Sequence, residues 1–170
     1  MERELLFSRE EILARVKELA RQISSEYAGK EPVMVGVLNG AVFFFSDLVM
    51  ALTIPSKIDF IRAASYGSEV KSSGSVTLIK DVEVSLKGKH VIVVEDIVDT
   101  GLTLKKIVKN LEEKAPESIK VCALIDKMER REEEVIIDYR GFHVHEGFLI
   151  GYGLDFDEQY RYLPDIYALR

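Results

Sequence analysis

The sequence predicts an α/β fold, in which a parallel, twisted sheet is flanked by helices on both faces. Three short runs, residues 33–38, 91–94 and 119–125, are almost entirely apolar. Such runs are typical of strands that are covered on both faces. Segments with helical spacing of apolar residues lie between them, and strands that alternate with helices form parallel sheets. The length of 170 residues favours a single domain over residues 1–170.

The first predicted helix begins at Ser8, because Ser8-Arg9-Glu10-Glu11 fits a capping box in which Ser8 and Glu11 bond each other's amides. Apolar residues at helical spacing follow, and we expect the helix to end near Gly29. These residues are Ile12, Val16, Leu19, Ala20 and Ile23. Asn39-Gly40 ends the strand at 33–38, and residues 41–52 are predicted to form a buried helix.

The second part of the chain continues the alternation. Residues 57–64 and 76–79 are predicted strands on either side of a polar stretch, and Lys87-Gly88-Lys89 is a turn. The strand at 91–94 is followed by a helix that Pro116 ends, and then by the strand at 119–125. One face of that helix carries Leu104, Ile107, Val108 and Leu111. Shorter strands are expected at 135–138 and 148–150, and the charge run at 129–134 is interpreted as a solvated turn.

Composition narrows the class of protein. The formal charge of −6 argues against nucleic acid as the main partner, because such binding usually needs a basic face. No stretch approaches the ~18 apolar residues of a membrane helix, and the first residues lack the apolar core of a signal peptide. We therefore expect a cytoplasmic protein without a membrane partner. Cys122, the single cysteine, is expected to be a buried strand residue.

The chemistry is concentrated in residues 91–103. A buried strand there delivers two adjacent carboxylates, Glu95 and Asp96, and the loop from Asp99 then opens a helix. Free amides and the helix dipole at such a point favour an anion. Gly101 lacks the Cβ that would block a phosphate. The simplest alternative, that Asp99 or Thr100 only caps the helix, leaves the two upstream acids without the metal or sugar hydroxyls that buried carboxylates need.

The run Glu95-Asp96-Ile97-Val98-Asp99-Thr100-Gly101 resembles the signature of the type I phosphoribosyltransferases, specifically the hypoxanthine-guanine branch. The resemblance implies that Glu95 and Asp96 hold the ribose hydroxyls of 5-phosphoribosyl diphosphate. It also implies that Asp99 lies near N7 of a purine base as a general base, and that a small hood formed by chain-terminal segments covers the sheet. The residues that the resemblance assigns to the 5′-phosphate are Thr100, Gly101, Leu102 and Thr103. The chain contains neither a P-loop Gly-Lys-Ser/Thr nor a Gly-x-Gly-x-x-Gly run.

Two further segments resemble substrate loops of the family. Leu38-Asn39-Gly40 resembles the diphosphate loop, although the family often has lysine or arginine where this chain has Asn39. Backbone amides could still make that contact. Ser65-Tyr66-Gly67 resembles the loop that closes over the reacting centre and would exclude water from it.

The remaining matches concern the base and the metal. The resemblance implies that Lys127 donates to a 6-oxo group, that Phe148 stacks on the purine, and that the backbone of Leu149 meets its edge. A solvated lysine and ordinary core packing of the phenylalanine are the alternatives. Within Gly151-Tyr152-Gly153-Leu154-Asp155, Asp155 resembles the acid that anchors Mg²⁺, mostly through water, and Arg161 matches the arginine that reaches the diphosphate.

The resemblance implies an Mg²⁺-dependent transfer of the phosphoribosyl group to N9 of hypoxanthine or guanine, in a protein that forms a dimer or tetramer. Asp155, Glu95 and Asp96 are then the candidate metal residues. A xanthine-guanine enzyme is one alternative. The other is a regulator that only senses phosphoribosyl diphosphate, which would carry a DNA-binding segment or basic surface that this chain has no room for.

Overall fold

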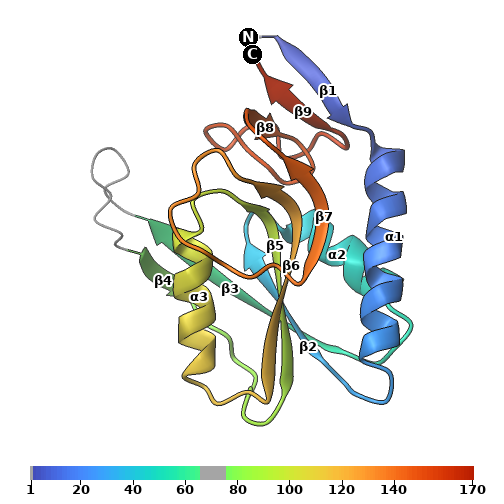
Figure 1. The fold of residues 1–170 in the computed structure, drawn as a ribbon, viewed down its shortest axis with the longest axis vertical. Coiled ribbons are helices and arrows are strands. Elements are labelled where there is room, and N and C mark those ends of the chain that lie inside the picture. Colours follow the sequence, from blue (N-terminus) through green and yellow to red (C-terminus); the bar gives the residue numbers. More distant parts are fainter. Residues whose placement is uncertain (1, 66–75) are drawn as a thin grey trace.

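The computed structural model of the chain describes residues 2–65 and 76–170. Its centre is a six-stranded sheet in the order β4-β3-β2-β5-β6-β7, flanked by helices (Figure 1). The strands are β2 (Val33–Leu38), β3 (Lys57–Ser65), β4 (Val76–Lys80), β5 (His90–Val98), β6 (Ser118–Lys127) and β7 (Tyr139–Val144). All pairs are parallel except β3 with β4. The predicted α/β class is confirmed, with an antiparallel edge strand added to the parallel sheet.

The apolar strands are buried on both faces because alternate residues serve two separate cores. In β5, Ile92 and Val94 pack against helices α1 (Arg9–Glu26) and α2 (Val42–Ala51). Val91 and Val93 face the other way and pack with α3 (Leu102–Glu112). The two-residue period of a strand thus explains why an uninterrupted apolar run is required here.

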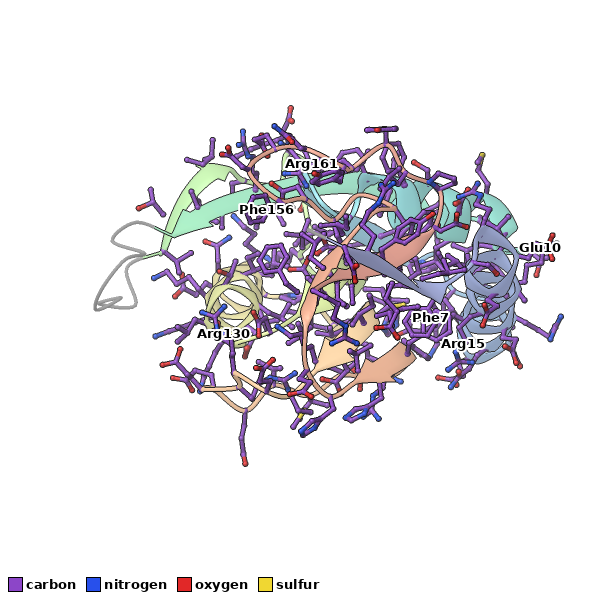
Figure 2. The ribbon with its side chains drawn as sticks, turned by 90° about the horizontal axis from the view of Figure 1, so that it is seen from above. Phe7, Glu10, Arg15, Arg130, Phe156 and Arg161 are labelled. Atoms are coloured by element: carbon purple, nitrogen blue, oxygen red, sulfur yellow. The ribbon has the colours of Figure 1, made fainter. Side chains whose placement is uncertain are left out.

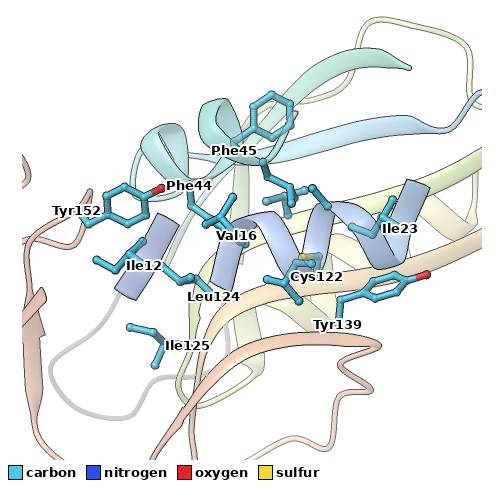
Figure 3. Packing of buried hydrophobic residues seen from close by; sticks show 14 of the residues in the cluster. Ile12, Val16, Ile23, Phe44, Phe45, Cys122, Leu124, Ile125, Tyr139 and Tyr152 are labelled. Carbon is cyan, nitrogen blue, oxygen red and sulfur yellow. The ribbon is translucent and has the colours of Figure 1, made fainter. Parts of the chain in front are cut away.

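Helix α1 begins with the predicted capping box. The Glu11 amide donates to Ser8 Oγ at 3.2 Å, and the Ser8 amide donates to Glu11 Oε1 at 3.2 Å. The predicted apolar stripe of α1 is buried, and Figure 3 shows it packed between α2 and β6. Cys122 of β6 is buried in this cluster, as expected.

A second, three-stranded antiparallel sheet covers one end of the molecule, where both termini lie (Figure 1). Its order is β1 (Arg3–Phe7), β9 (Ile166–Leu169), β8 (Phe148–Ile150). The first and last strands of the chain therefore pair with each other. We call residues 148–169 together with β1 the hood, and its presence confirms the predicted hood of chain-terminal segments.

The predicted strand at 135–138 is wrong. These residues form no strand, and β7 begins immediately after them at Tyr139. Val135 and Ile137 still pack against the core beside α3, which accounts for the apolar pattern. Within the described ranges, no helix combines the length and the apolar character that crossing a membrane requires.

Candidate active site

A cavity of about 240 Å³ opens where β2 and β5 end and α3 begins. Carboxyl ends of parallel strands are the usual ligand site of such sheets. Most of the residues singled out in the central motif meet there. The lining residues are Val37, Leu38, Gly40, Ala63, Glu95, Asp96, Ile97, Val98, Asp99, Thr100, Gly101, Thr103 and Leu104. Asn39 and Leu102 do not line it.

Glu95 and Asp96 are both buried within β5, which extends to Val98 rather than ending at residue 94. The Asp96 amide donates to Glu95 Oε1 at 2.9 Å, and the Ile97 amide donates to Asp96 Oδ1 at 2.8 Å. Burial, followed by the charge of Asp96, raises the pKa of Glu95 well above its ordinary value. Burial likewise raises the pKa of Asp96. The pair is therefore a buried acidic site that a hydroxyl donor or a cation would stabilise.

The loop after Asp99 leads into α3 through Gly101, which is the N-cap residue and has φ of 86°. The interpretation of Asp99 or Thr100 as the N-cap is therefore wrong, although Thr100 Oγ1 accepts from the Leu102 amide at 3.3 Å. A Cβ on Gly101 would lie 2.7 Å from the Glu133 carbonyl oxygen. Glycine is thus required by the left-handed backbone and by the neighbouring segment, a different reason from the phosphate approach that the sequence suggested.

The Leu38–Asn39 peptide bond that precedes Gly40 is cis. A Cβ on Gly40 would lie 1.9 Å from Asp96 Oδ2, so only glycine fits against the acid pair. On its other side, a Cβ on Gly153 would lie 2.1 Å from the Gly40 carbonyl oxygen. The 38–40 loop is therefore in close contact with both β5 and the hood, a contact of Gly153 that the sequence did not predict.

Lys127 is the last residue of β6 and is 6% exposed, so the alternative of a solvated lysine is wrong. Its Nζ lies 3.6 Å from Asp99 Oδ1 and 3.9 Å from Glu129 Oε2. Asp99 Oδ1 is buried and accepts no hydrogen bond from the described residues. A buried carboxylate oxygen and a buried ammonium group thus face each other at the edge of the cavity.

The hood contributes Phe148, whose side chain lies largely outside the core: the residue is 47% exposed, and its ring centroid lies 5.4 Å from that of Phe156 in a T-shaped arrangement. The core-packing alternative for Phe148 is therefore wrong. Leu149 is buried in β8 and is paired with Ala168. Figure 2 looks down on this end of the molecule, with Phe156 and Arg161 on one side of α3 and Arg130 on the other.

Arg161 lies within hydrogen-bonding distance of its own loop. Its Nη1 donates to the Gly153 carbonyl at 2.6 Å, and its Nη2 contacts Glu158 at 2.6 Å and Asp155 at 3.5 Å. The Glu158 amide also donates to Asp155 Oδ2 at 2.8 Å. The positive charge of Arg161 acts to lower the pKa of Asp96, although burial outweighs it.

The described residues include no group of three or more His, Cys, Asp or Glu side chains placed to hold a metal. The structure thus does not gather Asp155, Glu95 and Asp96 into one set of ligands. The donor chemistry still fits Mg²⁺, which is usually held by one or two carboxylates, water and substrate phosphates rather than by an all-protein cage. The acid pair Glu95 and Asp96 offers such oxygens in a buried position.

The proposed closing loop is only partly described. Ser65 is the last residue of β3, and Tyr66 lies outside the described residues.

Arg131 and Phe156 were not predicted from the sequence. Arg131 belongs to the charge run interpreted as a solvated turn, yet its side chain is only 13% exposed and contacts Asp99. That interpretation is wrong for Arg131, because a run of charges does not indicate which member folds inward. Phe156 follows Asp155 directly, so the aromatic neighbour of a suspected metal residue was the available signal.

Residues 4–157 match the family described as "Phosphoribosyl transferase domain". The hypoxanthine-guanine phosphoribosyltransferase of Aquifex aeolicus is 46% identical over 166 residues, which are 97% of this chain and 93% of that protein. The hypoxanthine-guanine-xanthine phosphoribosyltransferase of Tritrichomonas foetus is 44% identical over 98% of this chain and 91% of its own. A crystal structure of a hypoxanthine-guanine phosphoribosyltransferase from Bacillus anthracis superimposes with a TM-score of 0.93 at 42% identity, covering 98% of each chain.

Proposed function

Since the chain belongs to the hypoxanthine-guanine phosphoribosyltransferases of the phosphoribosyl transferase family, we propose that it salvages purines with 5-phosphoribosyl diphosphate. The phosphoribosyl group is transferred to N9 of hypoxanthine or guanine, which gives IMP or GMP and releases diphosphate. The observation that carries this proposal is the contact between the partly buried Asp99 and the buried Lys127, 3.6 Å apart, beside the buried acid pair Glu95 and Asp96.

The ribose end of the substrate fits the cavity between the strands. Glu95 and Asp96 accept from the ribose hydroxyls, which partly offsets the cost of burying two carboxylates. The amides at the start of α3, with the hydroxyls of Thr100 and Thr103, hold the 5′-phosphate where the helix dipole favours an anion. Gly40 lies against Asp96, and the backbone of Leu38, Asn39 and Gly40 holds the diphosphate.

The purine binds between the core and the hood. Lys127 Nζ donates to the 6-oxo group, because an ammonium group has donors and no acceptor. The exposed ring of Phe148 stacks on the base, and the backbone of Leu149 meets its edge. Ser65, the last residue of β3, leads into the segment to which the resemblance assigns closure over the reacting centre; Tyr66 of that segment lies outside the described residues.

The reaction is a displacement at the anomeric carbon of the ribose. N9 of the purine forms the new bond, diphosphate takes the electrons of the broken bond, and Asp99 accepts a proton from the base at N7. Arg161 and the backbone of the 38–40 loop stabilise the charge that develops on the diphosphate. Arg161 must exchange its contacts with Glu158 and Asp155 for the diphosphate to do so.

The same proposal includes Mg²⁺ as cofactor. Asp155, through water, and the acid pair Glu95 and Asp96 are the residues that would hold it beside the substrate. When bound, Mg²⁺ supplies positive charge that neutralises the diphosphate leaving group.

One alternative has specific support: xanthine as a further substrate, because the Tritrichomonas foetus relative is named for xanthine as well. The purified protein, supplied with 5-phosphoribosyl diphosphate and Mg²⁺, should form nucleotide with hypoxanthine and guanine. Nucleotide from xanthine at similar efficiency would favour the alternative. Tight binding of phosphoribosyl diphosphate without turnover of any base would instead indicate the sensing regulator.

A further inference from the structure

Arg131 connects three parts of the site through one guanidinium group. Its Nε donates to the Asp99 carbonyl at 2.8 Å. Its Nη2 lies 3.1 Å from the Val98 carbonyl, 3.1 Å from the Lys127 carbonyl and 2.6 Å from Asp126 Oδ1. Asp126 is itself buried, at 4% exposure. The end of β5 and the end of β6 are therefore joined by a buried, charge-assisted contact.

The residues after Arg131 extend this contact along the loop. The amides of Glu132 and Glu133 both donate to the Thr100 carbonyl, at 2.8 and 3.0 Å. Three successive carbonyls, from Val98 to Thr100, are thus held by residues 131–133. Because a peptide unit is planar and trans, each such carbonyl turns the following amide to the opposite side. The segment therefore sets the direction of the amides of residues 99–101, which line the cavity.

The same guanidinium group sets the distance between Asp99 and Lys127, the two residues that are proposed to act on the purine base. It donates to the backbone carbonyls of both residues, and Lys127 Nζ lies 3.6 Å from Asp99 Oδ1. Arginine suits this position because its donors diverge in a rigid plane, whereas a lysine has one compact ammonium group.

We propose that Arg131 is a positioning residue for phosphoribosyl transfer: it orients the 5′-phosphate loop and holds Asp99 and Lys127 in register without touching substrate. The inference rests on the proposed function and adds to it a residue outside the substrate contacts.

The test compares Arg131→Met and Arg131→Lys with Arg140→Met. Arg140 is the matched control, because it is paired with Asp126 Oδ2 at 3.1 Å but is half exposed and belongs to β7. Steady-state constants for phosphoribosyl diphosphate and hypoxanthine are measured per active site, together with the unfolding midpoint. Both Arg131 variants should lose roughly 10²-fold in kcat/KM with a raised KM for phosphoribosyl diphosphate, as misplaced catalytic groups do. Arg140→Met should change kcat/KM by less than about fivefold, because Arg140 is half exposed and Asp126 keeps its contact with Arg131.

A purely structural role would lower the unfolding midpoint and leave KM and kcat per active site unchanged, and that result, or full activity of Arg131→Lys, would overturn the proposal. If Arg131→Met does not fold, Arg131→Lys decides the question at a temperature where it is folded. Hydrogen exchange gives a reading independent of activity: the amides of Glu132 and Glu133 should exchange faster in Arg131→Lys. An inactive wild-type protein would refute the proposed function instead.

Discussion

At the scale of single residues, the site is defined by carboxylates that folding alone does not favour. Glu95 and Asp96 are adjacent and buried, and burial raises the pKa of both. Two buried carboxylates side by side do not stabilise the ligand-free protein, because burying charged groups without a partner costs free energy. Their sequence position on an apolar strand was enough to predict a polar ligand, because the physical cost of the arrangement can be read from the residue types.

The first prediction concerns Glu95→Gln, which keeps the size of the side chain and removes its charge. Burial in the folded protein raises the pKa of Glu95 above the ordinary value of 4.5. Ionisation of Glu95 therefore lowers the free energy of unfolding as the pH rises from about 4.5 through the pKa of the folded state. The variant should therefore be more stable than the wild type at neutral pH, with no gain below about pH 4.5. Each 1 kcal/mol gained raises the unfolding midpoint by roughly 2–4 °C in a chain of this size.

Thermal unfolding of the ligand-free proteins from acid to neutral pH measures this. Glu146→Gln, at an exposed position, is the control and should stay within about 0.5 kcal/mol of the wild type. An equal gain at all pH values would contradict the role assigned to burial. The affinity for phosphoribosyl diphosphate should be lower than that of the wild type in Glu95→Gln and unchanged in Glu146→Gln.

The second prediction concerns Asp99→Asn. Asp99 lines the cavity with a carboxylate oxygen that accepts no hydrogen bond from the described residues, 3.6 Å from Lys127. An amide cannot accept the purine proton, so kcat should fall by about 10²–10⁴-fold. Affinity for phosphoribosyl diphosphate, measured by calorimetric titration, should be largely retained because the acid pair is untouched. Wild-type turnover in the variant would remove Asp99 as the base.

At the scale of elements, the 99–103 loop depends on a segment that follows it by about thirty residues. Gly101 has a left-handed backbone, and its Cα faces the Glu133 carbonyl. The sequence predicted the loop and the helix after it but assigned Gly101 to phosphate approach. The contact with residues 131–133 crosses between two strand ends, and no local pattern in the sequence encodes it.

The third prediction tests that contact with Gly101→Ala. A left-handed alanine costs about 1–2 kcal/mol, and the added Cβ would meet the Glu133 carbonyl at 2.7 Å. Gly88→Ala is the matched control, because Gly88 is also left-handed, at φ of 70°, and has open space around the added carbon. Both variants should lose stability in chemical unfolding, but only Gly101→Ala should bind phosphoribosyl diphosphate more weakly. Equal binding by both would mean that the contact does not shape the loop.

The elements also show what sequence patterns can and cannot predict. The continuous apolar runs of β2, β5 and β6 were predicted because burial on both faces leaves no room for other residue types. Strands β1 and β9 were not: the first residues of β1 are exposed, so it carries no buried apolar run, and both strands lie outside the central sheet, paired only with each other and with β8. Residues 135–138 were wrongly predicted to form a strand. Val135 and Ile137 pack on the core without joining the sheet, and the apolar pattern in the sequence is the same in either case.

At the scale of the whole molecule, the hood is docked on the core through a buried tyrosine. Tyr152 follows β8, is buried, and its hydroxyl donates to Asp47 Oδ2 of α2 at 2.6 Å. The same carboxylate oxygen lies 3.3 Å from Arg9 of α1. Burial, together with the hydrogen bond to Asp47, raises the pKa of the Tyr152 phenol. The resemblance implied a hood, but the contacts that hold it on the core could not be predicted from the sequence, because Tyr152 and Asp47 are 105 residues apart.

The fourth prediction concerns Tyr152→Phe. Loss of a hydrogen bond to a charged group costs about 1.5–3 kcal/mol, which should lower the unfolding midpoint by several degrees. KM for hypoxanthine should rise, since the hood carries Phe148. Tyr162→Phe, at a tyrosine that is 78% exposed in the same part of the chain, is the control and should change neither quantity. An unaltered midpoint in Tyr152→Phe would show that the hydroxyl does not fasten the hood.

The central claim, a purine site that selects the 6-oxo group through Lys127, is tested most directly by comparing kcat/KM for hypoxanthine and adenine. Adenine presents a 6-amino donor to Lys127, and an unpaired donor in a closed site costs about 1–3 kcal/mol, or roughly 5–150-fold. The wild type should make negligible use of adenine. Lys127→Ala should lose efficiency with hypoxanthine and guanine far more than affinity for phosphoribosyl diphosphate, whereas Lys120→Ala, on the same strand, should not. Comparable wild-type efficiency with adenine and hypoxanthine would contradict the account.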